Sequence, residues 1–198
     1  GNGELLVRGH PRYLWGEKND TPARGGPLEA TAYTSQRTND ELFGSADAKY
    51  AALKRQLVAG GATAWAHDDV ERFIESQGRE VLRELMQSHL DLRGWAEPAE
   101  AVRGADGQER PHRRAGTSRA LETVFGEVRV ARTRHSGRGM SGLHPLDADL
   151  NLPPEKYSSE VRRRVALEAS RGSFEAASKS TSATTGAKVP KRQAEQLT

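Results

Sequence analysis

A basic segment with a strict alternation of residue types most constrains what this chain can fold into. The runs 119–124 and 127–134 flank Phe125 and Gly126, and in the second run valines alternate with arginine and alanine. Apolar residues at every second position on either side of a glycine turn indicate two antiparallel strands joined by a tight turn. The sequence therefore predicts a β-hairpin at 119–134.

The predicted hairpin is strongly basic. Eight arginines lie between residues 110 and 138, and residues 101–198 carry a net charge of +7, whereas residues 47–100 carry −3. A basic half joined to a slightly acidic half indicates a polyanion-binding face, and the alternative is a solvated surface with surplus arginine. We expect Arg129, Arg132 and Arg134 to contact DNA phosphates, although charge on an edge strand also protects against aggregation.

Two helices are predicted before the hairpin, in a helical region at 47–100. The first covers 47–58, with Asp47 as its N-cap and two glycines after it. The second covers 68–92, where apolar residues recur at three- and four-residue steps and therefore share one face. Asp68 is expected to cap this second helix, and Gly94 to end it.

Residues 1–46 have the composition of a disordered leader. They are rich in glycine and proline and show no sustained apolar period, so at most a short strand is expected at 5–7. The hydrophobic content of the whole chain, 35%, is below the usual 45–50% of a globular domain. Because the chain begins at Gly1 rather than at methionine, we expect a fragment of a longer protein.

The C-terminal region, 158–198, is predicted to form a truncated helix-turn-helix-like unit. Ser158 or Ser159 can cap a helix at 160–170, a short helix follows at 174–179, a loop runs to Gly186, and Pro190 opens the last helix. In a helix-turn-helix the first residues of the second helix reach base edges in the major groove. The predicted DNA contacts of this region are Arg162, Arg163, Lys188, Lys191, Arg192 and Gln193. The alternative is a helical hairpin with an exposed basic end.

The rest of the region 101–157 is predicted to be loop, as are residues 95–108. Asp147 and Asp149 could hold Mg²⁺ with His144 nearby, but no third carboxylate stands at a recognisable spacing, and a turn is the favoured interpretation. The chain has no cysteine, which excludes disulfides and thiolate metal sites. No apolar run approaches the roughly 20 residues of a membrane span, so we expect no membrane partner and a soluble, intracellular protein.

Five blocks of sequence carry a resemblance to a known family. They are Phe73–Arg93, Leu121–Val130, Leu143–Pro154 (LHPLDADLNLPP), Tyr157–Ser173 and Thr185–Gln193. In this order they resemble the N-terminal region of the Kra-type bacterial insertion-sequence transposases, over about residues 65–198. The resemblance implies a cytoplasmic bacterial DDE transposase that uses Mg²⁺, with its catalytic carboxylates after Thr198. It therefore implies no catalytic residue, metal ligand or cofactor in this chain.

Together these observations predict an α+β, mainly α, DNA-binding fragment of a transposase. Residues 174–197 would recognise the transposon ends in double-stranded DNA, and whether the chain is itself an enzyme stays open. Three alternatives are kept: a helical interaction module that forms a homodimer through 68–92, a metal-dependent enzyme built on Asp147 and Asp149, and a non-functional transposase remnant.

Overall fold

The computed structural model describes residues 39–95, 97 and 100–198. Over this part the chain is mixed α and β and mainly helical, as predicted, with six α-helices and two small antiparallel sheets. The strand expected at 5–7 and most of the expected leader lie outside the described residues. None of the described helices combines the length and the apolar composition needed to cross a membrane.

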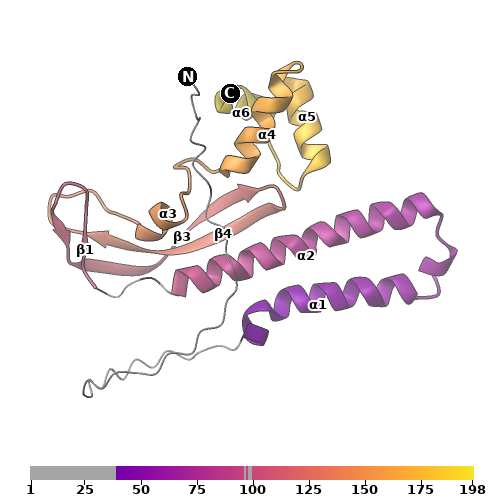
Figure 1. Cartoon of the computed structure of the whole chain (residues 1–198), viewed down its shortest axis with the longest axis horizontal. Helices are drawn as coiled ribbons and strands as arrows, with labels where there is room; N and C mark the ends of the chain where they lie inside the picture. Colours follow the sequence, from indigo (N-terminus) through magenta and orange to yellow (C-terminus); the bar gives the residue numbers. More distant parts are fainter. Residues whose placement is uncertain (1–38, 96, 98–99) are drawn as a thin grey trace, which may run out of the picture. The chain divides into compact units, whose positions relative to one another are not determined.

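Two antiparallel helices begin the described part (Figure 1). Helix α1 (Asn39–Val58) is joined to helix α2 through a 3₁₀ turn, η1 (Ala62–Ala64). The predicted start of the first helix at Asp47 is wrong, because residues 39–46 are already helical. Ala46 is buried, and the Ser45 hydroxyl lies 2.9 Å from a carboxylate oxygen of Glu84 on α2, so contacts with a distant helix stabilise this turn.

Helix α2 (His67–Trp95) is longer than predicted at both ends. It begins before Asp68, which lies in the first turn rather than at the N-cap. In the first turn the negative charge of Asp68 still interacts favourably with the helix dipole. At the other end Gly94 is still helical, and the helix ends at the next residue, Trp95. A Cβ at Gly94 would lie 2.8 Å from the carbonyl oxygen of Ala131, so this glycine lets the helix approach the neighbouring strand.

The predicted hairpin is present and longer than expected. Strand β3 (His112–Thr123) pairs antiparallel with strand β4 (Gly126–Ser136), with Thr123 opposite Gly126, so the loop residues are Val124 and Phe125. Gly126 therefore belongs to the strand, with a positive φ of 120°, and not to the loop. The pairing slips between Arg114 and Thr117, where a bulge interrupts β3.

Part of the loop predicted at 95–108 is a second, small hairpin. Strand β1 (Val102–Arg103) pairs with strand β2 (Glu109–Arg110). The buried Arg110 guanidinium donates to Asp106 and to the carbonyl oxygen of Ser141, which ties this hairpin to the segment after β4.

Helix α3 (Pro145–Asp149) replaces the turn that was predicted around the two aspartates. Leu146 of this helix packs into a core between α2 and the long hairpin. The buried members of this core are Leu90, Leu121, Val128, Val130 and Leu146. The alternating apolar residues of β4 thus lie on the strand face that packs into this core.

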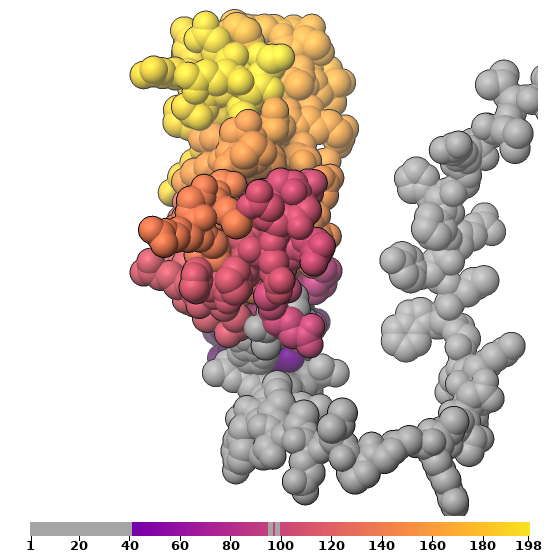
Figure 2. Space-filling model, turned by 90° about the vertical axis from the view of Figure 1, so that its left-hand side faces the viewer, coloured from indigo at the N-terminus to yellow at the C-terminus, as the bar shows by residue number. Residues whose placement is uncertain are grey.

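Three helices close the chain: α4 (Ser159–Ala169), α5 (Phe174–Thr184) and α6 (Lys191–Leu197). Figure 2 shows their residues, coloured orange to yellow, gathered in one cluster. Helix α5 is longer than the predicted 174–179, because Thr181 on its last turn is buried and extends the packed surface. Pro190 stands at the N-cap of α6 rather than inside it.

Candidate nucleic-acid interface

The three C-terminal helices form a unit with its own core. Ser158 and Ser173 cap α4 and α5, since each side chain accepts a hydrogen bond from a backbone N–H three residues later. The buried core residues come from α4, α6 and the connecting segments, namely Tyr157, Val161, Val165, Ala187, Val189 and Ala194, and the partly buried Phe174 of α5 packs against them. This core holds α6 and the segment before it against α4 and α5.

The buried carboxylate of Glu122 fastens this unit to the hairpin. Its side chain accepts a hydrogen bond from the backbone N–H of Lys188 (2.8 Å), and its backbone pairs with Lys156 and Ser158. The N–H of Gly186 donates to the carbonyl oxygen of Val124 at the hairpin loop (2.8 Å). The segment between α5 and α6 is therefore held directly on the end of the hairpin.

Lysine and arginine side chains around the start of α6 are exposed. Among the described residues, no carboxylate lies within ion-pair distance of Lys188, Lys191 or Arg192. Gln193 is half-buried, and its amide donates to the side chain of Gln196. The structure thus brings the four predicted contacts of this segment together and leaves its three cations available to an external anion.

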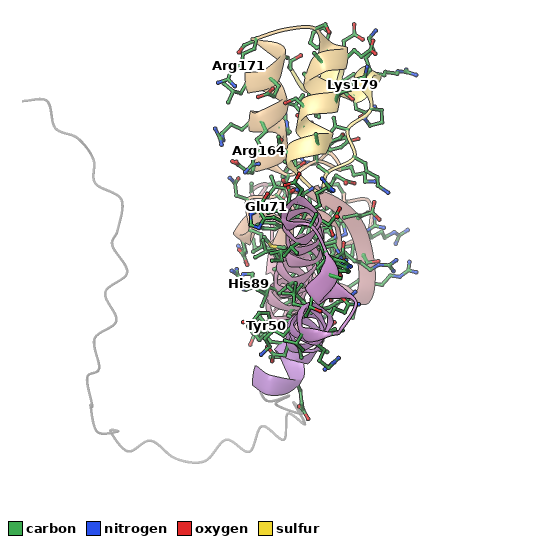
Figure 3. The ribbon with its side chains drawn as sticks, turned by 90° about the vertical axis from the view of Figure 1, so that its right-hand side faces the viewer. Tyr50, Glu71, His89, Arg164, Arg171 and Lys179 are labelled. Carbon is green, nitrogen blue, oxygen red and sulfur yellow. The ribbon has the colours of Figure 1, made fainter. Side chains whose placement is uncertain are left out.

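The arginines of α4 have partners within their own unit. The Arg163 guanidinium binds both carboxylate oxygens of Glu160, and Arg162 pairs with Glu155 at 3.1 Å. Hydrogen bonds from Arg163 and Arg164 lower the pKa of Glu160 to about 2. Arg164, Arg171 and Lys179, labelled in Figure 3, are likewise paired with glutamates.

The three predicted hairpin arginines differ in their surroundings. Arg129 and Arg134 are exposed and have no carboxylate partner among the described residues. Arg132, in contrast, is mostly buried and forms an ion pair with Asp147 of α3. Arg119 reaches the same carboxylate at 3.7 Å and also donates to two backbone carbonyls. The Arg132 side chain is therefore committed to fixing α3 on the hairpin.

This ion pair also decides what Asp147 can bind. One oxygen of its carboxylate, Oδ2, contacts two guanidinium groups, and the other, Oδ1, is buried without a hydrogen-bond partner among the described residues, so the carboxylate is closed to a hydrated Mg²⁺ ion. Asp149 lies exposed at the end of α3. Within the described residues no group of three histidine, cysteine, aspartate or glutamate side chains could hold a metal ion. The family resemblance implies that the ligands of its Mg²⁺ lie after Thr198, and we derive no step through a metal in this chain.

Two exposed arginines at the open end of the hairpin were not among the predicted contacts. Arg113 and Arg114 lie on β3, and neither has an ion-pair partner in the described part of the chain. Sequence pattern missed them because the bulge after Arg114 breaks the alternation that defined the strand. The only sequence feature that pointed to Arg113 and Arg114 was the high number of arginines between residues 110 and 138.

No family model, no curated protein and no solved structure matches the chain. The proposed function therefore rests on the geometry and charge of the described residues.

Proposed function

We propose that this chain binds double-stranded DNA through its C-terminal unit, with α5 and α6 as a helix-turn-helix. The observation that carries the proposal is the contrast in pairing between two basic segments. The arginines of α4 are neutralised by glutamates, whereas Lys188, Lys191 and Arg192 are exposed without a carboxylate partner. Unpaired cations gathered on one rigid segment are what phosphate binding requires.

The segment before α6 supports this proposal because it is held rigidly. Glu122 and the close approach at Gly186 fix its backbone on the hairpin, so its cations need little further ordering on binding. The second helix of such a motif reads bases with residues of its first turn. In this proposal Arg192 and Gln193 reach base edges, while Lys188 and Lys191 contact phosphates.

The family resemblance leads to a narrower proposal about the DNA. The chain would be the DNA-binding N-terminal region of a bacterial transposase, acting in the cytoplasm and recognising the terminal repeats of its insertion sequence. Catalytic chemistry is not assigned to any residue of this chain.

A binding titration tests the proposal. We expect the labelled duplex to bind with an affinity that falls steeply as salt rises, and insertion-sequence terminal repeats to bind more tightly than random duplex. Arg192→Ala should weaken binding to the repeats by about 1–3 kcal/mol if the side chain contacts a base. Arg163→Ala is the matched control, because that guanidinium is paired with Glu160.

The outcomes distinguish DNA binding in general from recognition of the terminal repeats. Equal, salt-sensitive binding to both duplexes would leave a phosphate-binding surface without end recognition. Wild-type affinity in the Arg192→Ala variant, or a complete absence of binding at low salt, would refute the assignment of α6.

Exposed apolar residues on α2 favour a second candidate, a helical interaction module that forms a homodimer. Ile74, Leu82 and Leu85 are 43%, 46% and 39% exposed, although the helix is otherwise packed against α1 and β4. A partner that covers such apolar side chains removes them from water, which lowers the free energy of the complex. Sedimentation of the wild type and of Leu82→Glu decides this candidate: a dimer lost in the variant supports it, and a monomeric wild type excludes it.

A further inference from the structure

The loop end of the long hairpin carries an exposed arginine on the side where the C-terminal unit docks. Glu122 stands opposite Glu127, and cross-strand partners share one face of a hairpin. Arg129 is two residues after Glu127 and therefore points to the same side. Because the Glu122 carboxylate accepts the backbone N–H of Lys188 at 2.8 Å, the C-terminal unit docks on this side of the hairpin. We call this side the docking side.

Arg129 and Lys188 are neighbours on the docking side. Glu122, which holds the backbone of Lys188, and Arg129 are diagonal neighbours across the two strands, and such pairs lie about 7–8 Å apart. The Lys156 ammonium group contacts both glutamates, Glu122 at 3.3 Å and Glu127 at 2.6 Å. Its hydrogen bond lowers the pKa of the Glu127 carboxyl, and the charges of Arg129 and Lys188 lower it further. Cations from the hairpin, from the segment before α4 and from the segment before α6 thus gather around one carboxylate.

A hollow of about 410 Å³ opens beside Arg129, and its lining includes Ser118 of the docking side and Gln87 of α2. The Gln87 side chain binds both the N–H and the carbonyl oxygen of Arg129, at 2.8 and 2.9 Å, so the backbone beneath the arginine is fixed. The Ser118 hydroxyl is exposed and has no hydrogen-bond partner in the described part of the chain. A guanidinium and a hydroxyl beside a hollow are donors of the kind that bind phosphate oxygens.

The exposed part of the docking side is short. Thr133 and His135, which follow Ala131 on the same side of β4, are buried. Arg134 points to the opposite side, because neighbouring side chains alternate along a strand. The exposed arginine of the docking side thus lies at the loop end, next to the C-terminal unit.

Arg129 is also available to a ligand, unlike the arginine of α2 beside it. Arg83 lines the same hollow, but its guanidinium is paired with two glutamates of its own helix. For Arg129 no carboxylate lies within ion-pair distance among residues 39–95, 97 and 100–198. Arg129 therefore shares with Lys188 both its exposure and its lack of a partner, and a phosphate beside it would lie next to the cations of the C-terminal unit.

We propose that the hollow beside Arg129 holds a backbone phosphate of the same duplex that α6 engages, with the Arg129 guanidinium and the Ser118 hydroxyl as donors. This proposal rests on the proposed function, because it needs DNA on the C-terminal unit. It adds Arg129 to the DNA-binding surface, leaves Arg134 outside it, and makes Glu127 a charge that opposes binding. Because the ligand group is a phosphate, the contact is independent of base sequence.

Two exposed arginines of β4 form a matched pair for the test. Arg129→Ala and Arg134→Ala each remove one cation without a carboxylate partner in the described part of the chain, but from opposite sides of the strand. Binding of a random duplex of about 20 base pairs is measured by fluorescence anisotropy between 50 and 200 mM salt. One phosphate contact contributes a salt slope of about 0.9, so over this range the wild type should lose about 3.5-fold more affinity than Arg129→Ala. Arg134→Ala should lose as much affinity as the wild type.

Charge variants distinguish phosphate binding from a structural role. Arg129→Lys keeps the cation and should keep the wild-type salt slope, which a merely structural role of the guanidinium would not produce. Glu127→Gln should tighten binding at low salt about two- to threefold, because the repulsion between unit charges roughly 7 Å apart in water is about equal to the thermal energy. Asp149→Asn is the control and should bind like the wild type, since Asp149 is exposed on α3, which packs on the opposite side of the hairpin.

A cleavage experiment locates the duplex independently of affinity. The chain has no cysteine, so Ala131→Cys carries a single iron–EDTA label at the edge of the docking side. With peroxide and ascorbate this label should cut the backbone of the bound duplex. The same label on Asp149→Cys, on the opposite side of the hairpin, should leave the duplex intact.

Four outcomes overturn the proposal. A wild-type salt slope in Arg129→Ala, while Arg192→Ala weakens binding, removes the hollow from the site and leaves the proposed function standing. An equal loss of slope in both β4 variants shows a general effect of net charge and refutes the assignment of Arg129. Cleavage from Asp149→Cys but not from Ala131→Cys places the duplex on the other side of the hairpin. A wild type that binds no duplex at low salt refutes the proposed function and this inference with it.

Discussion

Replacement of Gly186 by alanine tests the contact on which the arrangement of the DNA-binding unit depends. A Cβ at this position would lie 2.7 Å from the backbone nitrogen of Gly126 and still closer to the carbonyl group of Phe125. Both are backbone atoms, so the methyl group cannot be accommodated by rotating a side chain. The hairpin loop and the segment before α6 must move apart.

The expected loss follows from the hydrogen bonds that this movement breaks. Gly186 donates to Val124 and Lys188 donates to the carboxylate of Glu122, both at 2.8 Å. A neutral hydrogen bond contributes about 0.5–1.5 kcal/mol and one to a charged acceptor about 1.5–3 kcal/mol. These contributions already include the bonds that water makes in the open form, so we expect Gly186→Ala to lower the free energy of unfolding by about 2–4.5 kcal/mol.

Urea unfolding followed by circular dichroism measures this loss, and Gly172→Ala provides the control. The nearest atom to a Cβ at Gly172 is the Cβ of Ala176 at 3.7 Å, an ordinary contact, so the control should change stability by less than about 1 kcal/mol, in either direction. If Gly186→Ala unfolds at the same urea concentration as Gly172→Ala, the C-terminal unit does not dock on the hairpin as described, and the reasoning fails.

Two further predictions concern α2 and α4. Gly78→Ala should stabilise the protein by about 0.5–1 kcal/mol, because nothing lies within 4 Å of the added methyl group, whereas Gly94→Ala in the same helix should destabilise it by about 1–3 kcal/mol through the clash with Ala131. Urea midpoints compare the two, and equal stabilisation would show that α2 does not lie against β4. Glu160 has its pKa lowered from 4.5 to about 2, so its contribution is present above pH 4.5 and is lost as the pH falls toward 2. Glu160→Gln should cost less than about 1 kcal/mol at pH 7, since the pair is largely exposed, and a difference that persists at pH 2 would contradict this account.

Local sequence patterns predicted the elements whose stability is decided by neighbouring residues. The valine alternation of β4 gave the hairpin, and the three- and four-residue spacing of apolar residues gave α2. Ser158 gave the start of α4, because a serine cap needs only the N–H groups of the next turn. The composition likewise indicated that positive charge gathers in the C-terminal half.

The sequence failed where a distant segment decides the outcome. Glycine at 94 indicates a helix end, yet the last turn of α2 includes it and the helix ends at Trp95, because the missing side chain lets this turn pack against Ala131. Asp47 has the chemistry of a cap, yet contacts between Ser45 and Glu84 extend α1 beyond it. Both errors arise because local propensity amounts to about 1 kcal/mol, which one tertiary contact can outweigh.

In the candidate site, too, some properties follow from the sequence and others only from the tertiary structure. The sequence by itself determined which residues carry charge, and it identified Lys188, Lys191 and Arg192 as the cations of one short segment. Only the tertiary structure decided which arginines are available, since Arg132 is neutralised by Asp147 from α3 while Arg129 on the same strand is exposed. The physical reason is that the attraction between two charges depends on their separation in space, and folding sets that separation by bringing distant segments together.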